Sequence, residues 1–360
     1  MTRPRSPFGR HPRPSFPAAR TDRYAGPTYY GQPALKPAPW DWLVAAYIFV
    51  AGVAGSAQII ATLVDLGGGR RARGVVRRGR HLALAGSVVG GPLLIADLKT
   101  PHRWYNMLRI FRRTSPMSIG SFILSGFGLF SGLTAVGQFL ADRTDHPLPR
   151  RLARAVQVPA ALAGAGMSTY TAALLSATST PLWAAAPRLL GARFGSSAVA
   201  TGAAALSLGE RVAGDGDPET ARTLDRVALA ATAADLAFSV AAERKYRALR
   251  VDGPLRDTAW GPVDKIGAIA VGAALPIACY ALSLRSRDPR RARGLSIAAS
   301  LAVLAGGMMM RQAVLHAGME SAKRPRDYVQ LARPERAARR AAGAGRVPRG
   351  GRDDARIAGR

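Results

Sequence analysis

The stretch WLVAAYIFVAGVAGSAQIIATLV, residues 42–64, decides the fold class because it contains no charged side chain. A helix needs about 20 apolar residues to cross the hydrocarbon core of a bilayer. Soluble proteins bury their cores with shorter amphipathic segments. This uncharged run therefore predicts a membrane-spanning helix.

Seven further runs along the sequence carry no charge or a single charge. They cover residues 81–96, 114–141, 155–187, 194–209, 227–242, 266–284 and 294–319. Lys and Arg at helix ends can reach the headgroups, so the shorter runs are long enough with their flanks. Lipid-exposed open sheets are not viable, and no run alternates with period two for long. The sequence predicts an all-α integral membrane protein with eight transmembrane helices.

The two ends of the sequence and the small residues give further expectations. Residues 1–39 are rich in Pro and Arg and residues 321–360 in Arg, Ala and Gly, so both predict disordered basic tails. Glycines recur on the predicted spans at interfacial spacing, and small residues let helices approach closely in lipid. These positions are Gly52, Gly55, Gly86, Gly90, Gly128, Gly132 and Gly164.

The charge balance of the 360-residue protein is strongly basic, with 51 Lys and Arg against 22 Asp and Glu. The long uncharged runs still exclude a soluble nucleic-acid-binding protein, and we expect no nucleic-acid partner. The tails either contact anionic lipid or stay solvated. Eight spans place both termini on one side of the cell membrane. A slim excess of Lys and Arg near that side favours cytoplasmic termini.

The loop between the second and third predicted spans holds the most specific motif. It reads LIADLKTPHRWYNMLRIFRRTSPMSIG, residues 94–120. Pro101 ends the preceding helix, Ser115 suits an N-cap, and Pro116 suits the first turn of the next helix. The pattern DL-x-x-P-x-R-[FW] followed by [RK]-x-[ST]-S-P-M-S-x-G resembles the NrfD/polysulfide-reductase membrane-subunit family.

Three other stretches share this resemblance. They are WDWLVAAYIFVAGVAGSAQ in the first span, GMSTYTAALLSATSTPLW at the end of the fourth and MMMRQAVLHAGMESA in the eighth. The resemblance covers roughly residues 38–325, in the family's order and with its span count. It implies two four-helix bundles, residues 40–180 and residues 181–320, with a quinone pocket in the first.

The resemblance also implies a function. Members of the family are quinone-reactive anchors of molybdopterin oxidoreductases, and such a subunit performs no substrate chemistry alone. This protein would exchange electrons between the quinone pool, menaquinone or ubiquinone, and an iron–sulfur partner of a Mo- or W-pterin catalytic subunit. The implied partners are a four-cluster iron–sulfur subunit, a molybdopterin catalytic subunit and membrane lipid.

The resemblance places Tyr170 against a quinone carbonyl. A phenol in an apolar pocket can donate a hydrogen bond while it stays neutral. The alternative is a tyrosine of the aromatic belt near a helix end. Tyr47 stands where the polysulfide reductase subunit has a histidine, and Val44 stands where it has an asparagine, so the pocket departs from the family pattern.

The charged residues of the motif lie at the expected mouth of this pocket. Asp97, Lys99 and Arg103 are suited to relaying protons or holding a partner. For Lys99 and Arg103, contact with lipid headgroups is an equal alternative. The residues expected to dock the iron–sulfur partner are His102, Arg109, Arg112 and Arg113.

Two charges lie well inside apolar runs of the second half, Asp235 and Arg311. Intramembrane charges are costly and normally face a partner or a water-filled cavity, so we expect the two to pair. With Glu210 and Glu243 at span ends they predict a proton path. A structural ion pair is an equal alternative. A polytopic transporter with a midplane site at Asp235 and Arg311 is a second reading, which the lack of a clear internal repeat disfavours.

Cofactors bound within the protein are not expected. His81, His102 and His316 lack the spacing of a bis-histidine haem site, and Cys279 has no partner for a thiolate metal site. We therefore expect no haem, flavin or metal in this subunit.

Overall fold

A computed structural model describes residues 33–68, 70–144, 146–213 and 216–332. Every regular element in these ranges is helical, which confirms the all-α prediction. Most of the two predicted tails, residues 1–32 and 333–360, lies outside the described residues. The long helices are α1 (Trp42–Leu66), α2 (Arg73–Ala96), α3 (Pro116–Arg143), α4 (Pro147–Ser176), α6 (Pro187–Val212), α7 (Pro218–Ala248), α10 (Leu275–Arg285) and α11 (Pro289–Lys323).

Shorter elements connect the long helices. They are η1 (Arg70–Ala72), η2 (Pro101–Leu108), α5 (Pro181–Ala184), α8 (Gly253–Asp257), α9 (Trp260–Pro262), the π-helix η3 (Val263–Ala274) and α12 (Pro325–Ala332). Elements α9, η3 and α10 follow one another without a break as a single helix, Trp260–Arg285.

Within the described residues, six helices are long and apolar enough to cross a membrane. They are α1, α2, α3, α4, the continuous α9–η3–α10 helix and α11. Helices α6 and α7 have 26 and 31 residues but are not among these six. The eight-span count and the division into two bundles therefore remain predictions.

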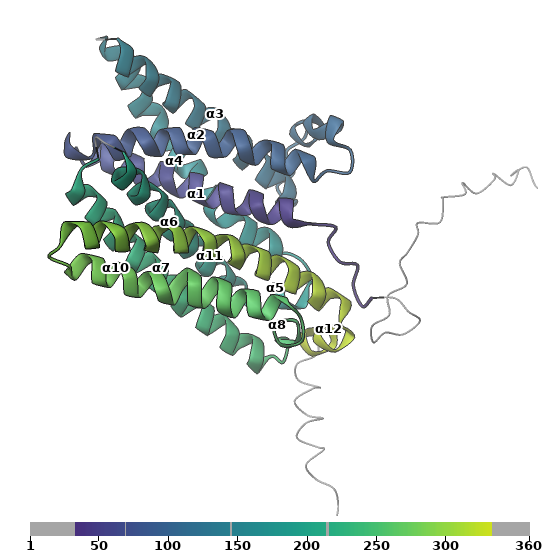
Figure 1. The fold of residues 1–360 in the computed structure, drawn as a ribbon. Coiled ribbons are helices and arrows are strands. Elements are labelled where there is room, and N and C mark those ends of the chain that lie inside the picture. Colours follow the sequence, from purple (N-terminus) through teal and green to yellow (C-terminus); the bar gives the residue numbers. More distant parts are fainter. Residues whose placement is uncertain (1–32, 69, 145, 214–215, 333–360) are drawn as a thin grey trace, which may run out of the picture.

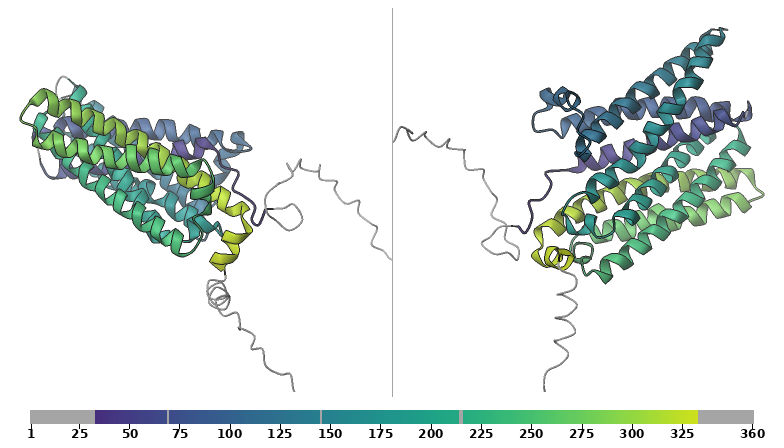
Figure 2. Two further views of the ribbon diagram at one scale, coloured as in Figure 1. Left: turned by 60° about the horizontal axis from the view of Figure 1, so that its bottom comes forward. Right: turned by 180° about the vertical axis from the view of Figure 1, so that it is seen from behind.

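The long helices lie side by side, with α1–α4 on one side of the molecule and α6, α7, α10 and α11 on the other (Figure 1; Figure 2). Helix α1 lies between the two groups and packs against α2, α4, α6 and α11. The two ends of the described residues lie at the same end of the molecule, where Leu35 N–H donates to the Ala322 carbonyl at 2.9 Å.

Glycines decide how closely some helices cross. A Cβ added at Gly55 would lie 2.4 Å from the carbonyl oxygen of Gly164, so α1 and α4 are in backbone contact there. Gly86 likewise packs on Ala54 of α1. Gly128 and Gly132 of α3 have no atom within 4 Å of an added Cβ among the described residues. For that last pair, the predicted close packing is wrong.

The C-terminal boundary also differs from the prediction, which placed a disordered tail from residue 321. Helix α11 continues to Lys323, and α12 follows at once, with Pro325 in its first turn. The hydroxyl of buried Ser321 accepts the Leu182 N–H at 3.1 Å, which ties this segment to α5. The prediction rested on the basic composition of this segment, which does not report its contacts with distant residues.

Candidate functional site

A cavity of about 240 Å³ opens between α1, α2, α3 and α4, at the end of the molecule where η2 lies. Four of the five residues expected to contact a quinone line it, namely Tyr47, Asp97, Lys99 and Tyr170. Most of the remaining lining is apolar, and it includes Val44. The fold thus brings together positions that are more than 120 residues apart in the sequence.

Tyr170 reaches the cavity because of a glycine on the neighbouring helix. Its ring on α4 points at Gly120 of α3, where an added Cβ would lie 2.0 Å from the phenol oxygen. The glycine that ends the SPMSIG motif is therefore the place where the Tyr170 phenol fits. Sequence reasoning quoted this glycine as part of the motif but did not assign it a role.

Tyr47 lies on the facing side of the cavity. It is a buried residue of α1, and its ring packs beside Gly90 of α2. Among the described residues, no group hydrogen-bonds the hydroxyl of Tyr47 or that of Tyr170. Two phenol donors thus remain available to a molecule in the cavity.

Asp97 ends α2 at the mouth of the cavity, and Lys99 follows it as an exposed residue. Burial, reinforced by the neighbouring Asp41, raises the pKa of the Asp97 carboxyl above its ordinary value. A carboxyl with a raised pKa exchanges its proton closer to neutral pH than an ordinary carboxyl does. Asp97 is therefore suited to holding a proton between bulk water and the cavity.

Arg103, the fifth predicted residue, does not line the cavity but is exposed on η2. The four predicted docking residues are exposed on the same side of the molecule, along η2 and the segment that leads to α3. They are His102, Arg109, Arg112 and Arg113. Large exposed apolar side chains stand among them, including Trp104 and Phe111. Basic and aromatic groups thus form one exposed surface beside the cavity mouth.

The charges in the second group of helices are arranged differently from the prediction. Asp235 of α7 does not pair with Arg311 but lies with its Oδ1 3.8 Å from Nε of Arg193. Arg193 also donates to Asp264 Oδ1 at 2.7 Å. Arg311 is buried and donates to the Ser197 hydroxyl and the Gly307 carbonyl, at 3.1 and 2.8 Å.

Sequence reasoning missed Arg193 and Asp264 because it assigned both to loops. Helix α6 begins at Pro187, six residues before Arg193, and Asp264 lies in the first turn of η3. The available signal was Pro187, which can open a helix, but Gly191 lies between it and Arg193.

Glu210 and Glu243, the other residues of the expected proton path, lie apart from this cluster. Glu210 is buried in an ion pair with Arg78. Glu243 forms a partly exposed pair with Arg247. Neither shares an ion-pair partner with Asp235 among the described residues. Within the described part of the protein, the expected path is therefore not a continuous series of contacts.

His316, one of the three histidines considered for a haem site, packs on an aromatic ring. Its imidazole stacks on the Trp260 ring with centroids 4.1 Å apart. The described residues contain no group of three or more His, Cys, Asp or Glu that could hold a metal ion.

The arrangement defines a class of protein, a helical membrane protein with an apolar cavity that two phenols and a carboxyl line. The family model described as "Polysulphide reductase, NrfD" matches residues 32–321, and the chain belongs to this family. Among curated proteins, the C subunit of polysulfide reductase from Wolinella succinogenes is 26% identical over 151 residues. That match covers 38% of this protein and 48% of the relative, so it spans about half of the relative's length.

Proposed function

We propose that this protein is the membrane anchor and quinone- or quinol-interacting subunit of a multi-subunit oxidoreductase. The observation that carries the proposal is the cavity that Tyr47, Tyr170, Asp97 and Lys99 line. Membership of the NrfD family supports it. The partners are an iron–sulfur subunit with four clusters and a Mo- or W-pterin catalytic subunit.

The residues of the cavity fit a quinone ring, either menaquinone or ubiquinone. The walls are mostly apolar, and the volume of about 240 Å³ is slightly below the roughly 300–1,000 Å³ of typical ligand pockets. A ring can enter while its prenyl tail stays in lipid. Val44 cannot hydrogen-bond, whereas the hydroxyls of Tyr47 and Tyr170 are donors on the walls.

A bound quinone supplies two-electron chemistry coupled to protons. The Tyr170 hydroxyl donates to a carbonyl oxygen and stabilises the more negative, reduced form. Asp97 holds a proton at the mouth and moves it between water and the cavity. The exposed surface along η2 and up to Arg113 docks the iron–sulfur partner beside this mouth.

We further propose that α6 and α7 cross the membrane, which gives eight spans in two four-helix bundles with cytoplasmic termini. At about 1.5 Å per residue, α6 is about 39 Å long, enough for a hydrocarbon core of about 30 Å. Charges inside these helices are partnered, since Arg193 contacts Asp264 and Arg211 contacts Asp225. Such pairing lowers the cost of placing them in lipid.

The substitution Tyr170→Phe tests the quinone site, because it keeps the ring and removes the donor. The assembled complex should keep its activity with artificial electron dyes and lose quinone-coupled activity. One lost donor corresponds to about 1–3 kcal/mol, or roughly ten- to a hundredfold in rate. Tyr328→Phe, on the exposed surface of α12, is the matched control and should retain both activities.

Unchanged quinone-coupled turnover in Tyr170→Phe, combined with its loss in Asp97→Asn, would place the ring at the mouth instead of beside α4. Unchanged turnover in both variants would remove the cavity from the mechanism.

A further inference from the structure

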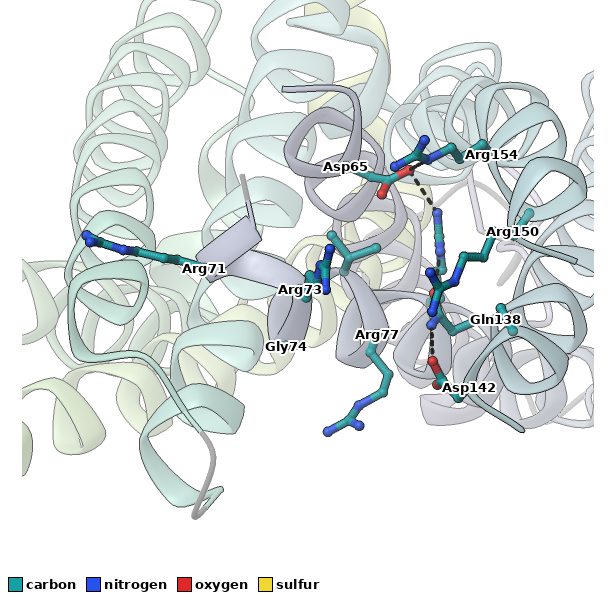
Figure 3. A pocket seen from close by; sticks show the side chains of 13 residues that line it. Asp65, Arg71, Arg73, Gly74, Arg77, Gln138, Asp142, Arg150 and Arg154 are labelled. Carbon is teal, nitrogen blue, oxygen red and sulfur yellow. Dashed lines mark hydrogen bonds and ion pairs between the residues drawn. The ribbon is translucent and has the colours of Figure 1, made fainter. Parts of the chain in front are cut away.

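A second cavity, of about 440 Å³, lies at the opposite end of the molecule from η2 (Figure 3). The end of α1, the start of α2, the end of α3 and the start of α4 surround it. Its charged lining has six arginines and two aspartates, and one of the arginines, Arg71, pairs with Glu219 outside the lining at 3.4 Å. The charged residues of the lining are Arg71, Arg73, Arg77, Arg80, Arg150, Arg154, Asp65 and Asp142.

Arg80 is the buried part of this cavity, with 4% of its surface exposed. Its guanidinium contacts Asp65 Oδ2 at 3.2 Å and donates to the side-chain oxygens of Gln138 and Gln157. The Nε–H of Arg80 has no hydrogen-bond partner among the described residues. Because an unpaired buried donor is costly, this group suits an acceptor supplied from outside the protein.

The arginines of this cavity outnumber its carboxylates. The Asp65 carboxylate contacts two guanidinium groups, that of Arg80 and, at 3.5 Å, that of Arg154. Arg73 and Arg150 have neither a carboxylate nor a hydrogen-bond partner in the described part of the protein. In Figure 3 the guanidinium of Arg150 lies beside the Asp65 and Gln138 contacts, whereas Arg71 points away from them. The cavity thus keeps an excess of positive charge.

Helix ends of both polarities meet at this cavity. Helix α2 begins with Arg73, and Arg150 lies in the first turn of α4. Neither helix has an acidic residue in its first turn. The two N-termini carry partial positive charge and the ends of α1 and α3 carry partial negative charge, so the helix dipoles offset one another and the arginine side chains supply the net positive charge.

We propose that this cavity binds an anionic ligand through its phosphate group, with Arg73, Arg80 and Arg150 as the contacts. Guanidinium groups match phosphate oxygens in a forked geometry. The cavity lies at the ends of the helices, where lipid headgroups are found, and its clustered arginines attract anionic headgroups. An anionic phospholipid and a soluble phosphate share this chemistry, and the experiment separates them.

The test compares the full-length protein with Arg73→Gln/Arg150→Gln in nanodiscs. Both residues are exposed, so their substitution leaves the buried contacts of Arg80 in place. The control is Arg291→Gln, which removes an exposed charge near the start of α11 at the same end of the molecule. One arm uses phosphatidylglycerol nanodiscs, and the other uses phosphatidylcholine nanodiscs with inorganic pyrophosphate. The readouts are Tm and retained lipid by native mass spectrometry.

Phosphatidylglycerol should raise the Tm of the native protein and of Arg291→Gln, and lipid should be retained by both. The double variant should bind about thirtyfold more weakly, because each arginine near anionic lipid contributes about fivefold. A rise in Tm with pyrophosphate in phosphatidylcholine, lost in the double variant, would assign the site to a soluble phosphate. The proposal is overturned if neither arm raises the Tm, if the double variant responds like the native protein, or if Arg291→Gln loses as much.

Discussion

Gly120 is the residue on which the position of Tyr170 depends. A methyl group there would overlap the phenol, so Gly120→Ala must displace Tyr170 or separate α3 from α4. Overpacking of this kind costs about 1–3 kcal/mol. We expect a lower Tm for the purified protein and reduced quinone-coupled turnover.

Gly128→Ala on the same helix is the control, since an added Cβ there meets no described atom within 4 Å. A Gly-to-Ala change in a helix interior normally stabilises by about 0.5–1 kcal/mol. Equal Tm values for the two variants would show that the contact with Tyr170 does not constrain the helices.

Arg193 is the residue that holds two carboxylates in the second group of helices. Arg193→Gln should remove the cation that buried Asp264 and partly buried Asp235 share, and breaking a buried pair costs about 3–5 kcal/mol. Arg247→Gln removes a surface partner of Glu243 and should cost less than about 1 kcal/mol. Thermal unfolding in detergent compares the two, and equal losses would contradict the buried network.

The sequence indicated the position of some residues in the fold but not of others. The family resemblance predicted one pocket for Asp97 and Tyr170 from two separate stretches, the loop motif and the end of the fourth span, and both residues line the cavity. Arg193 could not be assigned, since the boundary of an apolar run marks where charge begins and not where a helix begins. Its partner Asp264 is 71 positions away, and only packing brings the two together.

At the level of elements, we expect the docking of α12 to depend on pH. Burial raises the pKa of Asp327 from an ordinary 3.8 to about 6, against the opposing effect of Arg324 and with Asp252 and Asp257 nearby. The folded-state pKa is above the unfolded value. Stability from protonated Asp327 is therefore complete below about pH 4 and is lost as the pH rises through 6.

Hydrogen exchange measures this effect. Protection of the α12 amides should fall between about pH 4 and 6 and level off above, after correction for the intrinsic exchange rate. Asp327→Asn should abolish the pH dependence, because an amide does not titrate. A native protein whose α12 protection is flat across this range would show that the carboxyl ionises freely.

Some element boundaries followed from local chemistry and others did not. Ser115 caps α3 as predicted, with its hydroxyl accepting the Ser118 N–H at 3.3 Å beside Pro116. Local sequence carries this information because a cap is made within one turn. Helix α12 was missed because its stability comes from contacts with distant residues.

At the scale of the whole molecule, the side of the membrane on which each loop lies distinguishes six spans from eight. If α6 and α7 cross the membrane, a reporter fused after Asp217 lies on the same side as one fused after Asp288, and opposite to one fused after Arg250. A hairpin that stays on one face would put the reporters at Asp217 and Arg250 on the same side. Fusions at Arg20 and Arg340 should agree with each other under the eight-span topology.

The central place of α1 has a consequence for biogenesis. Helix α1 is synthesised before α2, α4 and α11, so it can pack against α2 and α4 early, but its contact with α11 forms only after more than 200 further residues have been synthesised. Until then one face of α1 has no protein neighbour. The hydrogen bond from Leu35 to Ala322 forms only after α11 has been synthesised. Quality control that senses unassembled membrane segments would therefore detect products truncated before α11 through the uncovered face of α1.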